Sequence, residues 1–268
     1  MNTQVSRRTL RSEVRFEGLG LHTGVPVVMT VRPGDAGIAF SLGAERTLAL
    51  PENVTDTTRS TRLGSVGTIE HLMSAFAGLE ITDAEVELTA PEVPGMDGSA
   101  LPYVNALLGA GFEDFGNLDV PSLFTRIFHQ EDELKVAVAK GSGHWRYVYD
   151  LGSRWPGQQS YELLDVTAGY VAEIAPARTF ALAEEIPHLI EHGLGKGLDE
   201  DSALILGIEG YKNEARFSEE PARHKLLDVI GDLYLAGVPI SMLSVVAERS
   251  GHRTNVAVAA MLRQAVWG

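Results

Sequence analysis

Segments with two different hydrophobic periods follow one another along the chain. Some alternate between apolar and polar residues, as in a half-buried strand, and others space apolar residues three or four positions apart, as on one helix face. The first kind predicts strands at 25–32, 37–42, 84–89, 135–139, 146–149, 202–206 and 240–246. The second kind predicts helices at 68–77, 99–108, 180–192, 219–236 and 255–266. This mixture predicts an α+β fold.

Capping residues define the expected ends of two helices. Thr68 is the expected N-cap of the helix at 68–77, and Gly78 directly follows its last residue. Ser218 is the expected cap of the helix at 219–236, which Gly237 and Pro239 end.

A weak internal repeat divides the chain in two. His71 and His224 each lie on an expected helix that ends in Ala-Gly and precedes a strand. The length of 268 residues, 44% of them hydrophobic, suffices for two domains with their own cores. Turn-forming residues cluster at 114–121, so we predict two related α+β domains, residues 1–119 and 120–268.

Composition removes several classes of function. The chain has no cysteine, which excludes disulfides, thiolate nucleophiles and cysteine-ligated metals, so any metal must be bound by histidines and carboxylates. A net charge of -14 argues against binding to nucleic acid or to an anionic membrane. The arginine-rich first 18 residues lack a continuous apolar core, and the most apolar stretch, 229–246, is interrupted by Gly, Asp and Pro. We therefore expect a cytoplasmic protein without membrane insertion.

The most informative polar pattern lies in RHKLLDVIGD, residues 223–232. On a helix His224, Asp228 and Asp232 fall on one stripe, and the first two are one turn apart, so they could chelate one metal ion. The alternative interpretation is a solvated His-Asp pair joined by a hydrogen bond.

Three other segments could complete a hydrolytic site. In TIEH, residues 68–71, His71 could be a third metal ligand and Glu70 a general base, or they could have only structural roles. His252 in the loop SGH could be a general acid or a solvated histidine. Thr179 in APARTF could donate to an oxyanion or cap the next helix. Phosphate-loop, dinucleotide-binding, HExxH and nucleophile-elbow motifs are absent, and a metal hydrolase remains.

Taken together, six segments in order closely resemble the UDP-3-O-acyl-N-acetylglucosamine deacetylase family. The resemblance covers nearly the whole chain, from about residue 8 to 262. The segments are GLGLHTG (18–24), TIEHLMSA (68–75), APEVPGMDGS (90–99), APARTF (175–180), RHKLLDVIGDL (223–233) and SGH (250–252).

The resemblance implies a Zn²⁺-dependent amidohydrolase that removes the acetyl group from a UDP-linked, 3-O-acylated N-acetylglucosamine, the committed step toward lipid A. It implies two related two-layer α/β sandwich domains, each with an insert, and an active site between them. The implied zinc ligands are His71, His224 and Asp228. Glu70 is the implied general base and His252 the general acid, which Asp232 orients. Thr179 would stabilise the oxyanion, and Lys225 and Phe180 would contact substrate.

One segment departs from the family pattern. Residues 198–202 read LDEDS in the insert that forms the family's acyl-chain passage, so Asp199 and Glu200 leave the acyl preference open. A zinc deacetylase of another acylated amino sugar and a non-catalytic nucleotide-sugar binding protein are the alternatives. We expect a monomer whose positive charge is concentrated at the zinc, Lys225 and Arg223.

Overall fold

Two five-stranded sheets with equivalent strand orders organise the protein, described over residues 2–268 by a computed structural model. The first sheet has the order β2 (Val14–Leu19), β3 (Pro26–Pro33), β8 (Ala84–Leu88), β4 (Ile38–Leu42) and β5 (Glu45–Leu48). The second has the order β10 (Ile127–Glu131), β11 (Leu134–Lys140), β16 (Leu243–Glu248), β12 (His144–Asp150) and β13 (Gln158–Leu163). In each sheet the central strand, β8 or β16, is antiparallel to one neighbour and parallel to the other.

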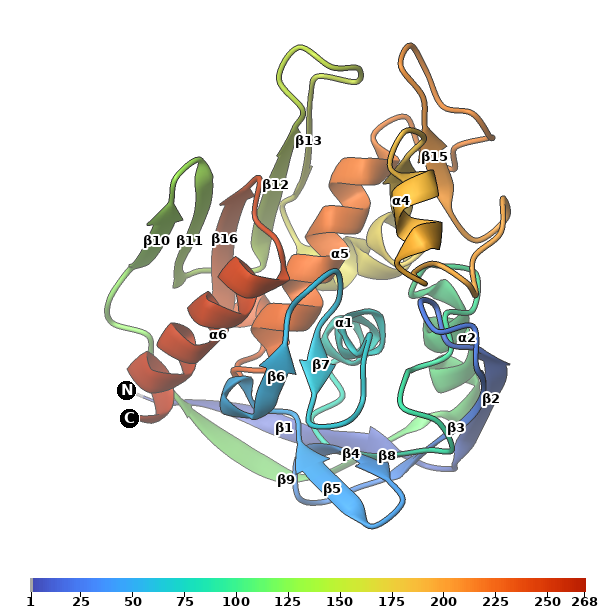
Figure 1. Ribbon diagram of the computed structural model, residues 1–268. Helices are drawn as coiled ribbons and strands as arrows, with labels where there is room; N and C mark the ends of the chain where they lie inside the picture. Colours follow the sequence, from blue (N-terminus) through green and yellow to red (C-terminus); the bar gives the residue numbers. More distant parts are fainter. Residues whose placement is uncertain (1) are drawn as a thin grey trace.

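Helices occupy matching positions around the two central strands. The helix α1 (Glu70–Gly78) precedes β8 and α2 (Leu101–Ala110) follows it, while α5 (Glu220–Tyr234) precedes β16 and α6 (His252–Trp267) follows it. The helices α1 and α5 pack against each other between the sheets (Figure 1). The α+β class and the duplication into two related halves are therefore confirmed, and one apolar core runs through both halves.

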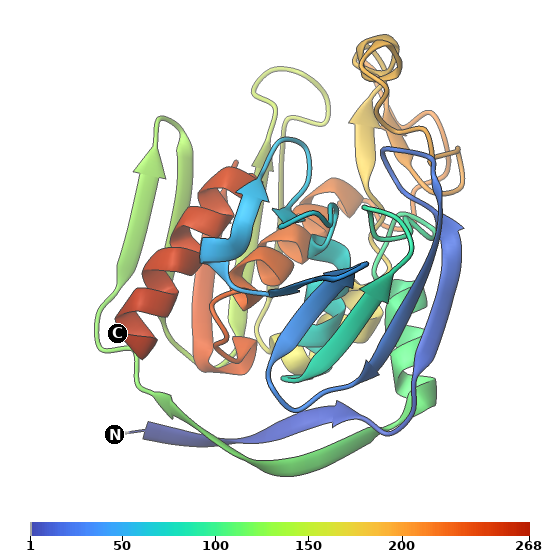
Figure 2. The ribbon, with the colours of Figure 1, turned by 60° about the horizontal axis from the view of Figure 1, so that its bottom comes forward.

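A two-stranded antiparallel ribbon of β1 (Asn2–Leu10) and β9 (Phe112–Pro121) runs along one side of the molecule (Figure 2). It joins the halves, because β1 contacts β3 and β9 contacts α6. The expectation of turns at 114–121 is wrong, since these residues form most of β9. Polar residues are tolerated on this partly exposed ribbon, and Gly116 lies at its irregularity with a φ of 117°. The domain boundary after residue 119 stays a prediction, and it falls within β9.

Each half carries an insert between its last sheet strand and its inner helix. The first insert holds the 3₁₀ turn Pro51–Asn53, β6 (Val54–Asp56) and β7 (Arg62–Leu63). The second holds α3 (Val166–Gly169), the π-helical turn Tyr170–Ile174, β14 (Phe180–Leu182), α4 (Ile186–Glu191) and β15 (Leu204–Leu206). The expected helix at 180–192 is wrong in its first part, because Phe180 to Leu182 pair in parallel with residues 204–206. A 3₁₀ turn, Ile240–Met242, precedes β16 in place of the expected start of that strand.

The expected helix caps also need correction. Thr68 is not the N-cap of α1: its φ is 60°, its hydroxyl donates to Glu92, and Ile69 holds the cap position. Ser218 does not cap α5, since its hydroxyl donates to the Glu219 side chain. Gly78 is the last residue of α1, where a Cβ would lie 2.1 Å from a Tyr170 ring atom. Within residues 2–268, no helix has the length and apolar character needed to cross a membrane.

Candidate active site

The helices α1 and α5 approach each other closely where both carry polar side chains. A Cβ on Gly231 of α5 would lie 2.1 Å from the carbonyl oxygen of Glu70, so only glycine permits this approach. It brings the predicted polar stripe of α5 beside Glu70 and His71, the first two residues of α1. Residues that lie more than 150 positions apart in the sequence thus form one site.

His71, His224 and Asp228 form a buried group whose ligand atoms all lie within 4.8 Å of one another. Asp228 Oδ1 is 3.7 Å from His71 Nε2 and 3.5 Å from His224 Nε2. His224 donates its Nδ1 proton to the Ala177 carbonyl at 3.0 Å, which leaves the Nε2 lone pair directed at the carboxylate. The solvated alternative for His224 and Asp228 is therefore wrong, since their side chains are only 3–4% exposed.

This donor set fits a metal ion. Asp228 Oδ1 is buried and has no hydrogen-bond partner among the described residues, and such an orphaned carboxylate oxygen is costly unless a cation satisfies it. Burial and the neighbouring His224 lower the pKa of His71 to about 3, and burial also lowers the pKa of His224. Both imidazoles are thus neutral, which is the state that binds metals. Two imidazoles and one carboxylate suit zinc.

Burial alone would favour a protonated Asp228. The charge of Lys225 nevertheless holds the pKa of Asp228 well below its usual range, and Lys225 Nζ donates to Asp228 Oδ2 at 2.9 Å. Asp228 therefore offers a negatively charged oxygen to the two histidines, with its other oxygen fixed by Lys225.

A second chain of polar contacts links Glu70, His252 and Asp232. His252, the first residue of α6, donates its Nδ1 proton to Asp232 Oδ2 at 3.0 Å, and its Nε2 lies 3.9 Å from Glu70 Oε1. Asp232 also accepts from Thr61 Oγ1 at 2.6 Å and from Asn255 Nδ2 at 2.9 Å. The imidazole is therefore held in one orientation, and the interpretation of His252 as a solvated histidine is wrong.

The surroundings of Glu70 and His252 shift the pKa values of both side chains. Burial raises the pKa of Glu70 to about 8, although the charge of His252 opposes the shift. Burial disfavours the imidazolium of His252, but the negative charges of Asp232 and Glu70 outweigh it and raise the pKa of His252 to about 9. His252 therefore carries a proton that it can release at neutral pH, and Glu70 exchanges its proton about one pH unit above neutral.

A cavity of about 350 Å³ brings these groups together. Its lining includes all the predicted site residues except Asp232, which lies behind His252. Phe180 is the first residue of β14 and Thr179 directly precedes it, so Thr179 does not cap a helix. Lys225 Nζ lies 5.7 Å from the centre of the Phe180 ring. Apolar side chains also line the cavity, among them Leu182, Leu189, Leu194 and Leu198.

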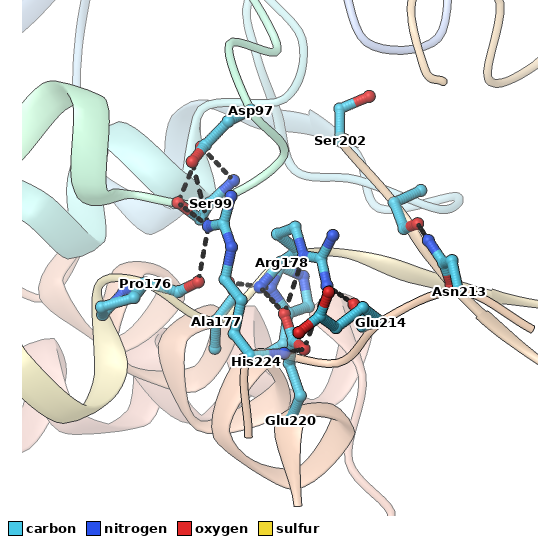
Figure 3. A network of polar contacts seen from close by, with 12 residues as sticks. Asp97, Ser99, Pro176, Ala177, Arg178, Ser202, Asn213, Glu214, Glu220 and His224 are labelled. Carbon is cyan, nitrogen blue, oxygen red and sulfur yellow. Dashed lines mark hydrogen bonds and ion pairs between the residues drawn. The ribbon is translucent and has the colours of Figure 1, made fainter. Parts of the chain in front are cut away.

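A buried arginine that sequence reasoning left without a role fixes the segment before β14. Arg178 donates through its backbone N and its Nε to Glu220 Oε1, both at 3.0 Å, and both side chains are buried (Figure 3). Its guanidinium also donates to the carbonyls of Asp201 and Glu214. Arg178 thus ties the Thr179 segment to the first turn of α5.

Glu92 is a second residue whose role the sequence did not reveal. Its buried carboxylate accepts from the backbone N of His22 and Thr23 at 2.8 and 2.9 Å, and from the Thr23 and Thr68 hydroxyls. His22 and Thr68 both line the cavity. Both glutamate and loop lie in motifs that the sequence singled out, but only the fold joins them.

Asp199 and Glu200, the acidic residues of the second insert that depart from the family pattern, do not line the cavity. Asp199 is exposed, and its Oδ1 accepts from the backbone N of Asp201 and Ser202 and from the Ser202 hydroxyl. Leu198 is the residue of this segment that lines the cavity. Arg223 is also absent from the lining, because its guanidinium lies 3.7 Å from the Tyr161 ring centre and pairs with Glu219. Lys225 is therefore the cation that faces the site from this motif.

Comparison with known proteins gives one consistent result. A family model described as UDP-3-O-acyl N-acetylglycosamine deacetylase matches residues 7–264. The chain is 38% identical to a UDP-3-O-acyl-N-acetylglucosamine deacetylase of Teredinibacter turnerae, over 94% of this chain and 88% of that protein. It is 35% identical to one from Geobacter sp. (strain M21), over 94% of this chain and 87% of the relative. A bifunctional LpxC/FabZ enzyme of Chlorobaculum tepidum is 32% identical over 97% of this chain and 64% of its own length.

Proposed function

From the premise that this chain belongs to the UDP-3-O-acyl-N-acetylglucosamine deacetylase family, we propose that the cavity between α1 and α5 is its active site. The family's reaction is hydrolysis of the N-acetyl group of a UDP-linked, 3-O-acylated N-acetylglucosamine in lipid A biosynthesis, and this is the activity of the chain. The observation that carries the proposal is the buried convergence of two imidazoles and one carboxylate next to the Glu70–His252 pair.

His71, His224 and Asp228 would hold Zn²⁺. The support is their spacing, their neutral imidazoles and the unpartnered Asp228 Oδ1. Zinc in such a site supplies Lewis-acid polarisation of a carbonyl and a lowered pKa for a water molecule. Asp228 Oδ2 accepts a hydrogen bond from Lys225, so the carboxylate would bind the ion through Oδ1.

Glu70 would be the general base. The backbone N of Thr61 donates to Glu70 Oε2 at 3.0 Å, which fixes the carboxylate and leaves Oε1 on the side of His252 and the cavity. At Oε1 the carboxylate would accept the proton of the attacking water.

His252 would be the general acid, with Asp232 as its positioning residue. Asp232 holds the Nδ1 of the imidazole, so the proton at Nε2 faces the cavity and would pass to the leaving amine nitrogen. A charged partner at Nδ1 favours the imidazolium that this step requires.

Thr179, Phe180 and Lys225 would bind substrate. Thr179 lines the cavity and would donate its hydroxyl proton to the developing oxyanion. Lys225 supplies positive charge at the cavity of an otherwise acidic protein, which suits an anionic nucleotide sugar. The four leucines of the cavity lining would cover the acyl chain and exclude water from it.

The test measures acetate release from UDP-3-O-acyl-N-acetylglucosamine together with metal content. Glu70→Gln and His252→Gln should retain the buried metal and lose about 10²–10⁴-fold in kcat, because general acid–base catalysis supplies about this much. His144→Gln is the matched control, since His144 also pairs with a glutamate but lies on β12 outside the cavity lining. Near-normal turnover in either site variant would contradict its assignment.

A further inference from the structure

A cluster of three potential metal ligands lies at the end of α4, outside the cavity. It consists of His188, Glu191 and His192, whose ligand atoms all lie within 4.8 Å of one another and whose side chains are exposed. His188 and His192 are one helical turn apart, and Glu191 lies three positions after His188. Within residues 2–268, this is the one such group besides His71, His224 and Asp228.

The ring of His192 is oriented for ligation. Its Nδ1 lies 2.9 Å from the carbonyl oxygen of His188. A carbonyl only accepts, so Nδ1 carries the proton and Nε2 keeps a free lone pair. His224 in the buried site is oriented in the same way by the Ala177 carbonyl. The rings of His188 and His192 are tilted by 46° with 4.0 Å between their centroids, so both can reach one ion.

The end of the helix also favours a cation. Gly193 has a φ of 70°, and the N atoms of Gly193 and Leu194 donate to the carbonyls of Ile190 and Leu189, which closes the helix directly beside the cluster. The C-terminal end of a helix dipole is negative. The net charge of -14 also favours cation binding.

The helix itself has little other support. It has six residues and none of them is buried, so neither its length nor its packing gives it much stability. An ion bound to both His188 and His192 would cross-link this helical turn and stabilise it. Leu189 of the same helix lines the cavity, so the bound ion would also reduce the mobility of part of the cavity wall.

We propose that His188, Glu191 and His192 form a second, exposed site for a divalent transition-metal ion, distinct from the buried site. Two imidazoles and one carboxylate select borderline ions such as Zn²⁺, Ni²⁺ and Cu²⁺ over Mg²⁺ or Ca²⁺. Bound metal stabilises the last turn of α4.

Equilibrium dialysis of the zinc-loaded full chain against Zn²⁺, with metal analysis, tests this site. The wild type should bind a second equivalent, the His188→Gln/His192→Gln double variant should lose only that equivalent, and His144→Gln should behave as wild type. His144 is a matched control because it offers a single imidazole beside one carboxylate. Amide hydrogen exchange across α4 should slow on Zn²⁺ addition in the wild type and remain unchanged in the double variant. Equal stoichiometry in wild type and double variant, or no second equivalent in the wild type, overturns the proposal.

Discussion

Gly231 of α5 lies against the carbonyl oxygen of Glu70 in α1, and a Cβ atom at position 231 would be only 2.1 Å from that oxygen. This contact sets the distance between α1 and α5, and each helix supplies part of the proposed metal site. A glycine in a helix interior costs stability relative to alanine, so its presence here is explained by the helix approach that it permits.

Gly231→Ala should therefore lower the free energy of unfolding by about 1–3 kcal/mol, as overpacking of a filled interface does. Metal affinity should fall with it, because the ligands on the two helices move apart. Urea unfolding and metal analysis measure both effects. Gly109→Ala is the control: Gly109 lies on α2 with no atom within 4 Å of an added Cβ, so this change should be neutral or stabilising by up to about 1 kcal/mol. Wild-type stability and metal affinity in Gly231→Ala would refute the packing argument.

Arg178→Met should destabilise the fold by about 3–5 kcal/mol, because it leaves the fully buried carboxylate of Glu220 without its cation. Chemical denaturation gives this value directly. The control Arg46→Met breaks an exposed ion pair with Glu85 and should cost at most about 1 kcal/mol. If both variants lost the same small amount, the role of Arg178 in holding the Thr179 segment would be excluded.

Asp232→Asn should shift the pH dependence of the reaction. The negative charge of Asp232 helps to raise the pKa of His252 to about 9, so its removal lowers this pKa toward the ordinary value of about 6.5. A general acid works only while protonated, and the alkaline limb of the kcat/KM profile should therefore move to lower pH. Asp132→Asn changes an exposed turn carboxylate and should leave the limb in place. An unmoved limb in Asp232→Asn would count against His252 as the acid.

Removal of the buried metal should abolish turnover and lower Tm. A ligand that binds only the folded state stabilises it by about 2.7 kcal/mol at a free concentration 100 times Kd, so Tm should rise with free Zn²⁺. In Asp228→Asn the ligand set loses its charge, and Tm should no longer respond to chelator at low free metal. Calorimetry with and without chelator checks this, and a chelator-insensitive wild type would remove the basis for the metal site.

The sequence by itself determined the features that depend on neighbours along the chain. The stripe of His224, Asp228 and Asp232 follows from helical periodicity, and the ordered motifs identified the family resemblance and the candidate residues. The strands β3, β4, β8, β11, β12 and β16 and the helices α1, α2, α5 and α6 were predicted from local patterns, with errors mainly at their ends.

Only the tertiary structure decided which distant groups meet. The ribbon of β1 and β9 and the short strand β14 depend on partners far away in the sequence, so local periodicity predicted turns at 114–121 and a helix at 180–192. The partners of Asp232, the carbonyl that orients His224 and the loop held by Glu92 come from separate elements. Spacing along a helix fixes which side chains share a face, but packing between elements fixes which faces meet, and the proposed chemistry depends on that packing.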